Sequence, residues 1–207
     1  MEISDKELSS ILRRHRRWLD GEDGGVCANL SGVDLSGARL AGADLSHAVL
    51  RSADLSGATL VRANLSGVDL SEADLSEADL SRANFYRATL SHANLAGSNL
   101  TRCNLSGVDL SRAVLTRAVL TGSNLTRADL AGADLNEADL TGTDLERADL
   151  ALADLTGADL TGSNLTAADL SYATLARANL ARVNLSGVDI SRANLSFANL
   201  AGSNLTR

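Results

Sequence analysis

The sequence predicts an all-β solenoid, and three features of its spacing carry that prediction. From Leu30 to Leu205 every fifth residue is leucine except at Phe85 and Ile190, so residues 28–207 form 36 consecutive five-residue units. Two places before the leucine the residue is always small, and it is alanine in 25 units. One place before the leucine it is Asp in 16 units and Asn in 13. Unbroken short repeats of this kind indicate stacked coils that each contact only their neighbours.

The five-residue period does not fit the ordinary regular elements. On an α-helix a step of five residues turns the chain by about 140° net, which spreads the leucines around every side. On a flat strand an odd spacing sends successive leucines to opposite faces. The pattern is satisfied if the small residue and the leucine both point inward and the next two residues face outward. Two outward residues in succession require a corner in every unit.

The unit, as in Ala53-Asp54-Leu55-Ser56-Gly57, resembles the A(D/N)Lxx motif of the pentapeptide-repeat family. The resemblance covers residues 28–207, and a motif repeated this often without an insertion is a specific signal. It implies a right-handed quadrilateral β-helix with four units, or 20 residues, in each coil. About nine coils spaced by about 4.8 Å would make a rod about 43 Å long.

The first residues carry the signals of a helix start. Ser4 and Glu7 are spaced as a capping box, and Ile3 and Leu8 as a hydrophobic staple. Gly21 is a plausible stop. Residues 5–20 are therefore predicted to be one amphipathic helix, with apolar spacing carried by Leu8, Ile11, Leu12, His15 and Leu19, and with Trp18 beside them.

This helix is expected to cover the open edge of the first coil, because an uncovered solenoid end exposes apolar side chains and unpaired backbone. Residues 22–27 form a short polar linker. The predicted domains are thus a capping helix and linker over residues 1–27 and a β-helix over 28–207. The opposite helix face carries four arginines around His15, which we interpret as a solvated face; binding to nucleic acid or an anionic membrane is the alternative. These arginines are Arg13, Arg14, Arg16 and Arg17.

Composition indicates an aliphatic core, since 44% of residues are hydrophobic and only 2% are aromatic. There is no proline to interrupt the winding. No long apolar run predicts a membrane span or a secretion signal, so a cytoplasmic location is expected. Cys27 and Cys103 are the only cysteines, and Cys103 stands at an inward position, where it would act as a compact hydrophobe. No disulfide framework is predicted.

The chemistry of an enzyme is not indicated. His15, His47 and His92 fall on the helix and on different sides of different coils, so they cannot assemble a metal cluster or a triad. No phosphate-binding loop appears, and a shaft filled with leucine and alanine leaves no pocket for a substrate. The sequence therefore predicts a non-enzyme without cofactor or metal.

If residues 20 apart stack in columns, the charges sort by side. The first two sides, which begin at Ala28 and Val33, sum to −9, whereas the other two sum to +3 with Arg207 included. Asp and Asn at this position can bond nearby backbone, so the charge could be incidental. Yet the fourth side uses Asn there in seven of nine coils, so the fold does not require a charge. The candidate partner-binding residues are Asp34, Asp54, Asp69, Asp74, Asp109, Asp129, Asp134, Asp149, Asp154, Asp169 and Asp189.

Few apolar residues are predicted to face outward. Leu152 and Tyr172 fall in one column on the acidic side, and Phe197 lies on the adjoining side near the same end. Because they gather toward one end of the predicted rod, they are candidate contact residues.

The leading functional hypothesis is a protein-binding module. The resemblance implies its sharpest version, a DNA mimic that binds DNA gyrase or topoisomerase IV and confers resistance to topoisomerase poisons. It also implies a homodimer through the C-terminal coil, whose edge is otherwise bare. Duplex DNA would carry about 25 charges over this length, against −9 on the acidic edge.

Other functional classes remain open at this point. One is a scaffold for some other partner or a simple spacer, and the regularity also fits a consensus-like or engineered repeat. Nucleic-acid binding through the basic edge is disfavoured, because +3 spread over a rod gives few phosphate contacts.

Overall fold

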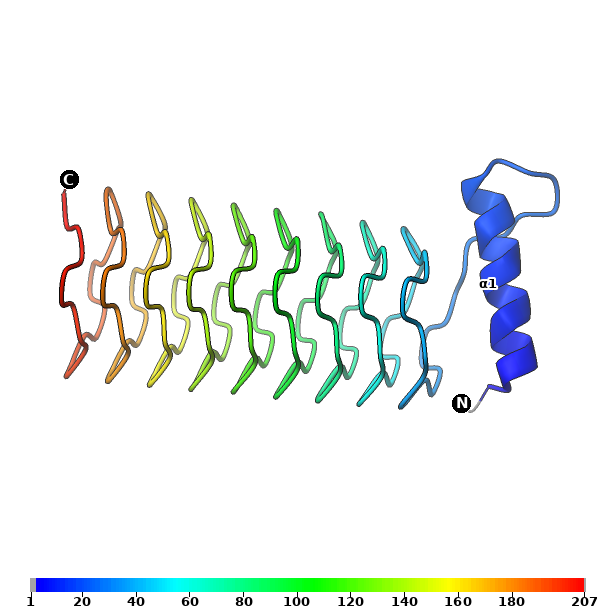
Figure 1. Cartoon of the computed structure of the whole chain (residues 1–207), viewed down its shortest axis with the longest axis horizontal. Coiled ribbons are helices and arrows are strands. Elements are labelled where there is room, and N and C mark those ends of the chain that lie inside the picture. The colour runs from blue at the N-terminus through cyan, green and yellow to red at the C-terminus, as the bar shows by residue number, and fades with distance from the viewer. Residues whose placement is uncertain (1–2, 207) are drawn as a thin grey trace.

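The computed structural model describes residues 3–206; Met1, Glu2 and the Arg207 counted above lie outside the described residues. An α-helix, α1 (Asp5–Leu19), lies across one end of a rod of stacked coils (Figure 1). Across residues 3–206 the coils pair through single-residue parallel bridges and form no longer strand. The helix ends one residue before the predicted boundary, with Asp20 as its C-cap.

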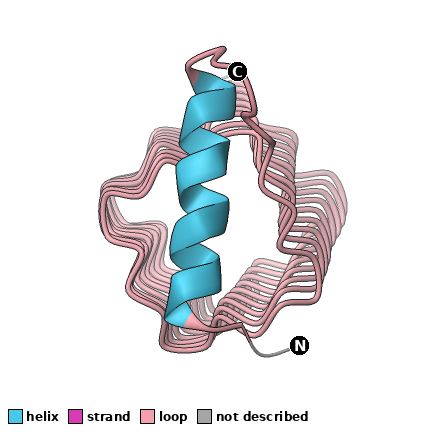
Figure 2. Ribbon diagram, turned by 90° about the vertical axis from the view of Figure 1, so that its right-hand side faces the viewer, coloured by secondary structure: helices cyan, strands magenta, loops and turns pink. Residues whose placement is uncertain are grey.

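The coils stack in a register of twenty residues. Bridges join the residue before each central leucine to its counterpart in the next coil, from Asn29 with Val49 to Asn184 with Asn204. Each coil therefore contains four five-residue units, as the sequence predicts, and the coils superimpose when viewed along the rod (Figure 2). This register places residues twenty apart in one column.

The interior is a dry aliphatic shaft. The central residues from Leu30 to Leu180 are at most 3% exposed, and the small residues before them line the same shaft. Phe85 occupies a leucine position without any exposure. Cys103 is buried among them, and burial raises the pKa of its thiol to about 12. The inward assignments made from spacing are confirmed for these coils. The outward assignments are confirmed less completely, because Ser46 and Ser71, each directly after a central leucine, are buried.

Every described corner of the repeat region uses left-handed backbone. The second residue after each central position has φ between 53° and 62° when it is not glycine and between 62° and 72° when it is. For a residue with a Cβ this conformation costs about 1–2 kcal/mol. The side chain of Asp or Asn supports the turn, as where Asp149 Oδ1 accepts the Ala151 N–H at 2.9 Å. The expected Asx bonding is therefore present.

Asparagine has a second role that the sequence did not reveal. On the fourth side Asn64 donates from Nδ2 to Asp44 Oδ1 at 3.0 Å, Asn84 to Asn64 Oδ1 at 3.3 Å, and Asn104 to Asn84 Oδ1 at 2.9 Å. We call this series the amide ladder. An ionised aspartate can accept in such a ladder but cannot donate, so each donor of the ladder is an asparagine.

The helix is fixed to the first coil by apolar contacts. Leu8, Ile11 and Leu12 pack against the core of the solenoid, as does Ile3 just before the helix. The predicted capping box is formed, since the Glu7 N–H donates to Ser4 Oγ at 3.3 Å and the Ser4 N–H to Glu7 Oε2 at 3.0 Å. These contacts cover apolar side chains of the first coil.

His15 lies at the centre of this junction and is fully buried, away from the exposed arginines that flank it in the chain. Its Nδ1 accepts the Ala28 N–H at 3.1 Å, and its ring stacks on Trp18 with 5.7 Å between centroids. No partner reaches its Nε2 within the described part of the chain. The apolar spacing placed this residue correctly, but its bond to Ala28 has no signature in the sequence.

The amide ladder predicts a penalty for removing one donor. The substitution Asn104→Asp keeps the oxygen that serves its own turn but loses the donor to Asn84. We expect it to lower the free energy of unfolding by about 1–3 kcal/mol, because two oxygens then face each other in a part-buried site. Urea denaturation at pH 7 measures this change.

The matched control is Asn194→Asp on the second side. The Asn194 carbonyl oxygen accepts the Ser196 N–H at 3.1 Å, its amide nitrogen makes no inter-coil hydrogen bond among residues 3–206, and its bridged neighbour Thr174 carries no charge. We expect this control to change stability by less than about 0.5 kcal/mol. Equal losses in the two variants would show that the ladder contributes nothing.

The buried imidazole predicts an acid-sensitive helix junction. Burial lowers the pKa of His15 below its usual 6.5, more than Asp44 and the Ser46 backbone raise it. The unfolded chain therefore takes up a proton at a higher pH than the folded one, and stability falls as the pH drops below 6.5. Protonation of Nδ1 also removes the acceptor of the Ala28 N–H. Fluorescence of Trp18 should show a transition with its midpoint below 6.5.

Two variants test the origin of that transition. His15→Gln should abolish it, because the amide does not titrate. His92→Gln, which changes an exposed histidine on the solenoid, should leave it in place. A transition that survives in His15→Gln would assign it to another group.

Candidate protein-binding faces

One row of carboxylates runs unbroken along the first side of the solenoid. Its members are bridged in successive coils, so they lie about 4.8 Å apart along the axis. Each uses Oδ1 to accept the backbone N–H of its own turn, and no ion pair reaches any of them within residues 3–206. We call them the aspartate row: Asp109, Asp129, Asp149, Asp169 and Asp189.

The remaining acidic candidates are more strongly engaged within the protein. Asp69 pairs with Arg51, with 3.4 Å between Oδ2 and Nη1. Asp74 Oδ1 accepts from Asn94 at 3.1 Å, and Asp134 Oδ2 accepts from Thr116 at 3.1 Å. Three others accept two bonds from the Ser or Thr of their own turns and lie on the second side: Asp34, Asp54 and Asp154. The aspartate row is therefore distinguished by its run of five successive coils and not by freedom from turn bonds, since Asp109 also accepts from Ser111 Oγ at 2.6 Å.

Hydrogen bonds keep several of these carboxylates ionised. Ser191, through its side chain and then its backbone, lowers the pKa of Asp189. At Asp69, burial raises the pKa, but bonds from Ser71 and the charge of Arg51 outweigh it and the net pKa is lowered. These acids are therefore negatively charged near neutral pH.

The three apolar candidates are all exposed at corners. Leu152 is 68% exposed, Tyr172 52% and Phe197 90%, and each has φ of 60–62°. Leu152 and Tyr172 follow Asp149 and Asp169 at the same corner, as predicted. The guanidinium of Arg192 lies over the Tyr172 ring, 5.3 Å from its centroid. The core gains nothing from these side chains, because they point away from it.

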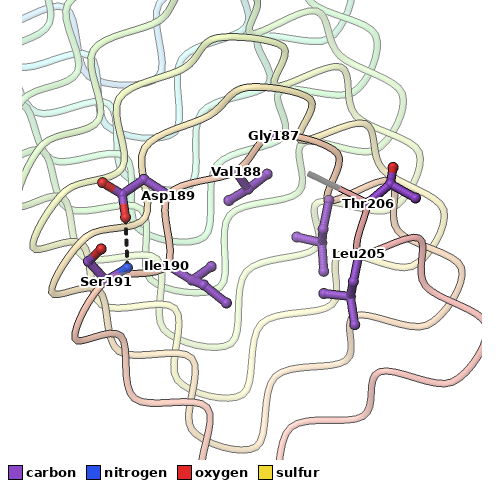
Figure 3. Close-up of a pocket in the computed structure, with 8 residues that line it drawn as sticks. Gly187, Val188, Asp189, Ile190, Ser191, Leu205 and Thr206 are labelled. Carbon is purple, nitrogen blue, oxygen red and sulfur yellow. Dashed lines mark hydrogen bonds between the residues drawn. The ribbon is translucent and has the colours of Figure 1, made fainter.

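The last coil presents a bare apolar end. Ile190 and Leu205 are 39% and 58% exposed, whereas their counterparts in earlier coils are buried. They line an open hollow of about 360 Å³ together with Leu185 and Val188 (Figure 3). A second hollow of about 540 Å³ separates α1 from the first coil and is lined by Leu8, Leu12 and residues 34–40.

Two other kinds of site find no support in the described chain. Within residues 3–206 no group of three or more His, Cys, Asp or Glu side chains could hold a metal ion. No helix in that range has the length and hydropathy to cross a membrane. Both described cysteines, Cys27 and Cys103, are free.

Comparison with known proteins identifies the repeat. The family model described as pentapeptide repeats matches residues 28–67, 63–102, 103–142, 128–166 and 168–207. No curated protein sequence matches the chain.

Many solved chains are similar to this one, HetL and QnrB1 among them. HetL, a pentapeptide repeat protein involved in heterocyst differentiation regulation in the cyanobacterium Nostoc sp. strain PCC 7120, is 35% identical. The similarity covers 97% of this chain and 96% of HetL, with a TM-score of 0.79. A trypsin-treated form of QnrB1, a plasmid-mediated fluoroquinolone resistance protein, is 20% identical over 86% of this chain and 89% of that one, with a TM-score of 0.54.

The QnrB1 likeness supports the fold alone, because its identity is low. The family model and HetL together cover nearly the whole chain and agree with the twenty-residue register of the coils. This chain belongs to the pentapeptide-repeat family, whose members form right-handed quadrilateral β-helices.

Proposed function

We propose that this protein is a non-enzymatic rod that binds a partner protein through the aspartate row and the apolar corner beside it. The observation that carries the proposal is the stack of five successive carboxylates, without ion pairs to any described residue and flanked by Leu152 and Tyr172. A matching partner segment presents a line of Lys or Arg beside an apolar or aromatic residue. Free cysteines fit action in the reducing cytoplasm.

Folding alone gives no reason for the row. Neighbouring carboxylates about 4.8 Å apart repel by about 0.9 kcal/mol even at the dielectric constant of water. Asparagine makes the same turn bond, as Asn164 does with the Thr166 N–H at 3.1 Å, without that repulsion. A charge repeated in five coils therefore favours a role in recognition.

The apolar corner supports the same conclusion. Leu152 and Tyr172 adopt left-handed backbone at the corner that Gly132 occupies one coil earlier. Glycine has no Cβ and takes this conformation without steric strain. A bulky side chain there costs conformational energy and buries little of itself. Burial of these side chains against a partner would offset this conformational cost.

HetL is a neighbour whose identity supports more than the fold. It is a pentapeptide repeat protein involved in heterocyst differentiation regulation. We propose a comparable regulatory binding role for this protein.

A second candidate is DNA mimicry directed at gyrase or topoisomerase IV, with resistance to topoisomerase poisons as its outcome. The aspartate row favours it, because it presents negative charge in a straight line along a rod. The acidic edge carries −9, against about 25 for duplex DNA of the same length. A scaffold with a different partner therefore stays the leading proposal.

Capture from a bacterial lysate tests these proposals with one matched pair of variants. The triple variant D129N/D149N/D169N should lose at least about tenfold of the captured partner, because it removes the central charges of the row. It should also melt slightly higher than the unmodified protein, since repulsion is relieved.

The control D79N/D139N/D159N removes the same charge from the third side, where Asp79 is an acceptor for Asn99. It should retain the partner. Equal retention by both variants would overturn the role of the row. Capture of topoisomerase subunits would favour the mimicry candidate, and capture of any other protein would favour the scaffold.

We also propose a homodimer through the C-terminal coil. Ile190 and Leu205 are exposed at that end, and their backbone N–H groups donate to no backbone carbonyl within residues 3–206, so a second copy could cover both features. Light scattering at micromolar concentration should give twice the chain mass, and Leu205→Glu should give a monomer. A monomeric unmodified protein would remove this proposal.

A further inference from the structure

We propose that a second surface, opposite in charge to the aspartate row, binds a short acidic segment of a partner protein. It consists of residues 62–67, 82–87, 102–107 and 122–127, which we call the basic face. These four segments contain five arginines and no Asp or Glu, in a protein of net charge −7. The inference does not depend on the aspartate row, which lies on another side.

Stacking brings these arginines together on two corners that border the fourth side. Arg62, Arg82 and Arg102 occupy the same corner of three successive coils, with φ of 57–61°. They therefore span about 10 Å along the axis. Arg87 and Arg127 stand on the opposite corner of the same side. Summing the charges of each side does not reveal this cluster. Arg62, Arg82 and Arg102 count toward the third side, whereas Arg87 and Arg127 count toward the fourth.

The five guanidinium groups are available for a ligand. All five arginines are exposed, and none forms an ion pair within residues 3–206. Arg87 lies over the ring of Tyr86, with 5.1 Å to the centroid. Arg51, Arg117 and Arg147 elsewhere on the solenoid do have acidic partners.

The floor between the two corners is polar and uncharged. It carries Asn64, Asn84 and Asn104, whose amides are engaged in the amide ladder. Ser106 and Thr126 bond each other at 2.9 Å in the next column. No carboxylate on this floor competes for the arginines, so an incoming anion is the available partner.

Acidic residues close the basic face at both ends and so limit what it can bind. Asp44 precedes it on the same side, and Asp144 and Glu146 follow it. The open length is about 14 Å, which matches an extended segment of four or five residues. A long polyanion such as a nucleic acid would continue onto these carboxylates. The geometry therefore favours a short acidic segment.

Arginine suits this ligand because its planar guanidinium forms paired bonds with carboxylate or phosphate. A run of Glu or Asp, or a segment with phosphoserine, offers the same chemistry. The two sources differ only in the anionic group that meets the arginines.

The test measures fluorescence anisotropy of labelled hexaglutamate, with a doubly phosphorylated serine peptide as the second probe, at low salt. The variant R82Q/R102Q should weaken binding of the preferred peptide by about tenfold or more. Glutamine takes the same corner backbone at similar cost, so folding should be unchanged, and a thermal melt checks this. Tighter binding of either peptide supports the proposal and identifies its anion.

Arg182→Gln is the matched control. Arg182 has the same corner column and φ of 59°, but it stands outside the basic face. Its substitution should change binding by less than about twofold. The proposal is overturned if neither peptide binds, if Arg182→Gln weakens binding as much as R82Q/R102Q, or if a thymidine oligonucleotide binds more tightly than both peptides.

Discussion

The structure depends on backbone hydrogen bonds between residues twenty apart. At each central position from Leu30 to Leu185 the N–H donates to the next coil, as Leu55 does to Asp74 at 2.7 Å, and Asp74 donates back to Ala53 at 2.9 Å. These bonds can repeat only if every unit turns one corner and returns its leucine to the shaft. The leucines fill that shaft at nearly zero exposure, so burial and backbone pairing impose the same register. All surface columns follow from that register.

Much of this could be predicted, because the period itself carries the information. Leu at every fifth position and a small residue two before it define the inward set without reference to any contact. The corner conformation was less accessible, since Arg, Glu and Leu152 occupy left-handed backbone that sequence alone would reserve for glycine. The amide ladder was also missed, although Asn recurs every twenty residues on the fourth side. The signal for the ladder is the recurrence of Asn in one column, and columns can be assigned only after the twenty-residue register is known.

The candidate surfaces show the same division. The aspartate row was predicted from residue spacing, and the structure adds that its members lack the ion pairs that engage Asp69. The basic face could not be recognised from the sides alone. Arg82 and Arg87 belong to two different five-residue units and border the fourth side from its two corners. The bond from Ala28 to His15 joins residues of the helix junction that no periodic pattern connects. Periodic features are thus readable from the chain, whereas contacts that break the period are not.

In this scaffold the residues required for folding and the residues available for recognition occupy different positions of the five-residue unit. The fold fixes the leucine, the small residue and the turn acceptor, and it leaves the two corner residues nearly free. At the corner after the central residue, glycine, Arg, Glu, Tyr172 and Phe197 all adopt similar backbone angles, so the left-handed turn favours glycine but does not select among the other residues. Their distribution along the columns is then set by other demands. Arginines without ion pairs at one corner and apolar residues beside aspartates at another are therefore informative about binding, because the coil would close equally well without them.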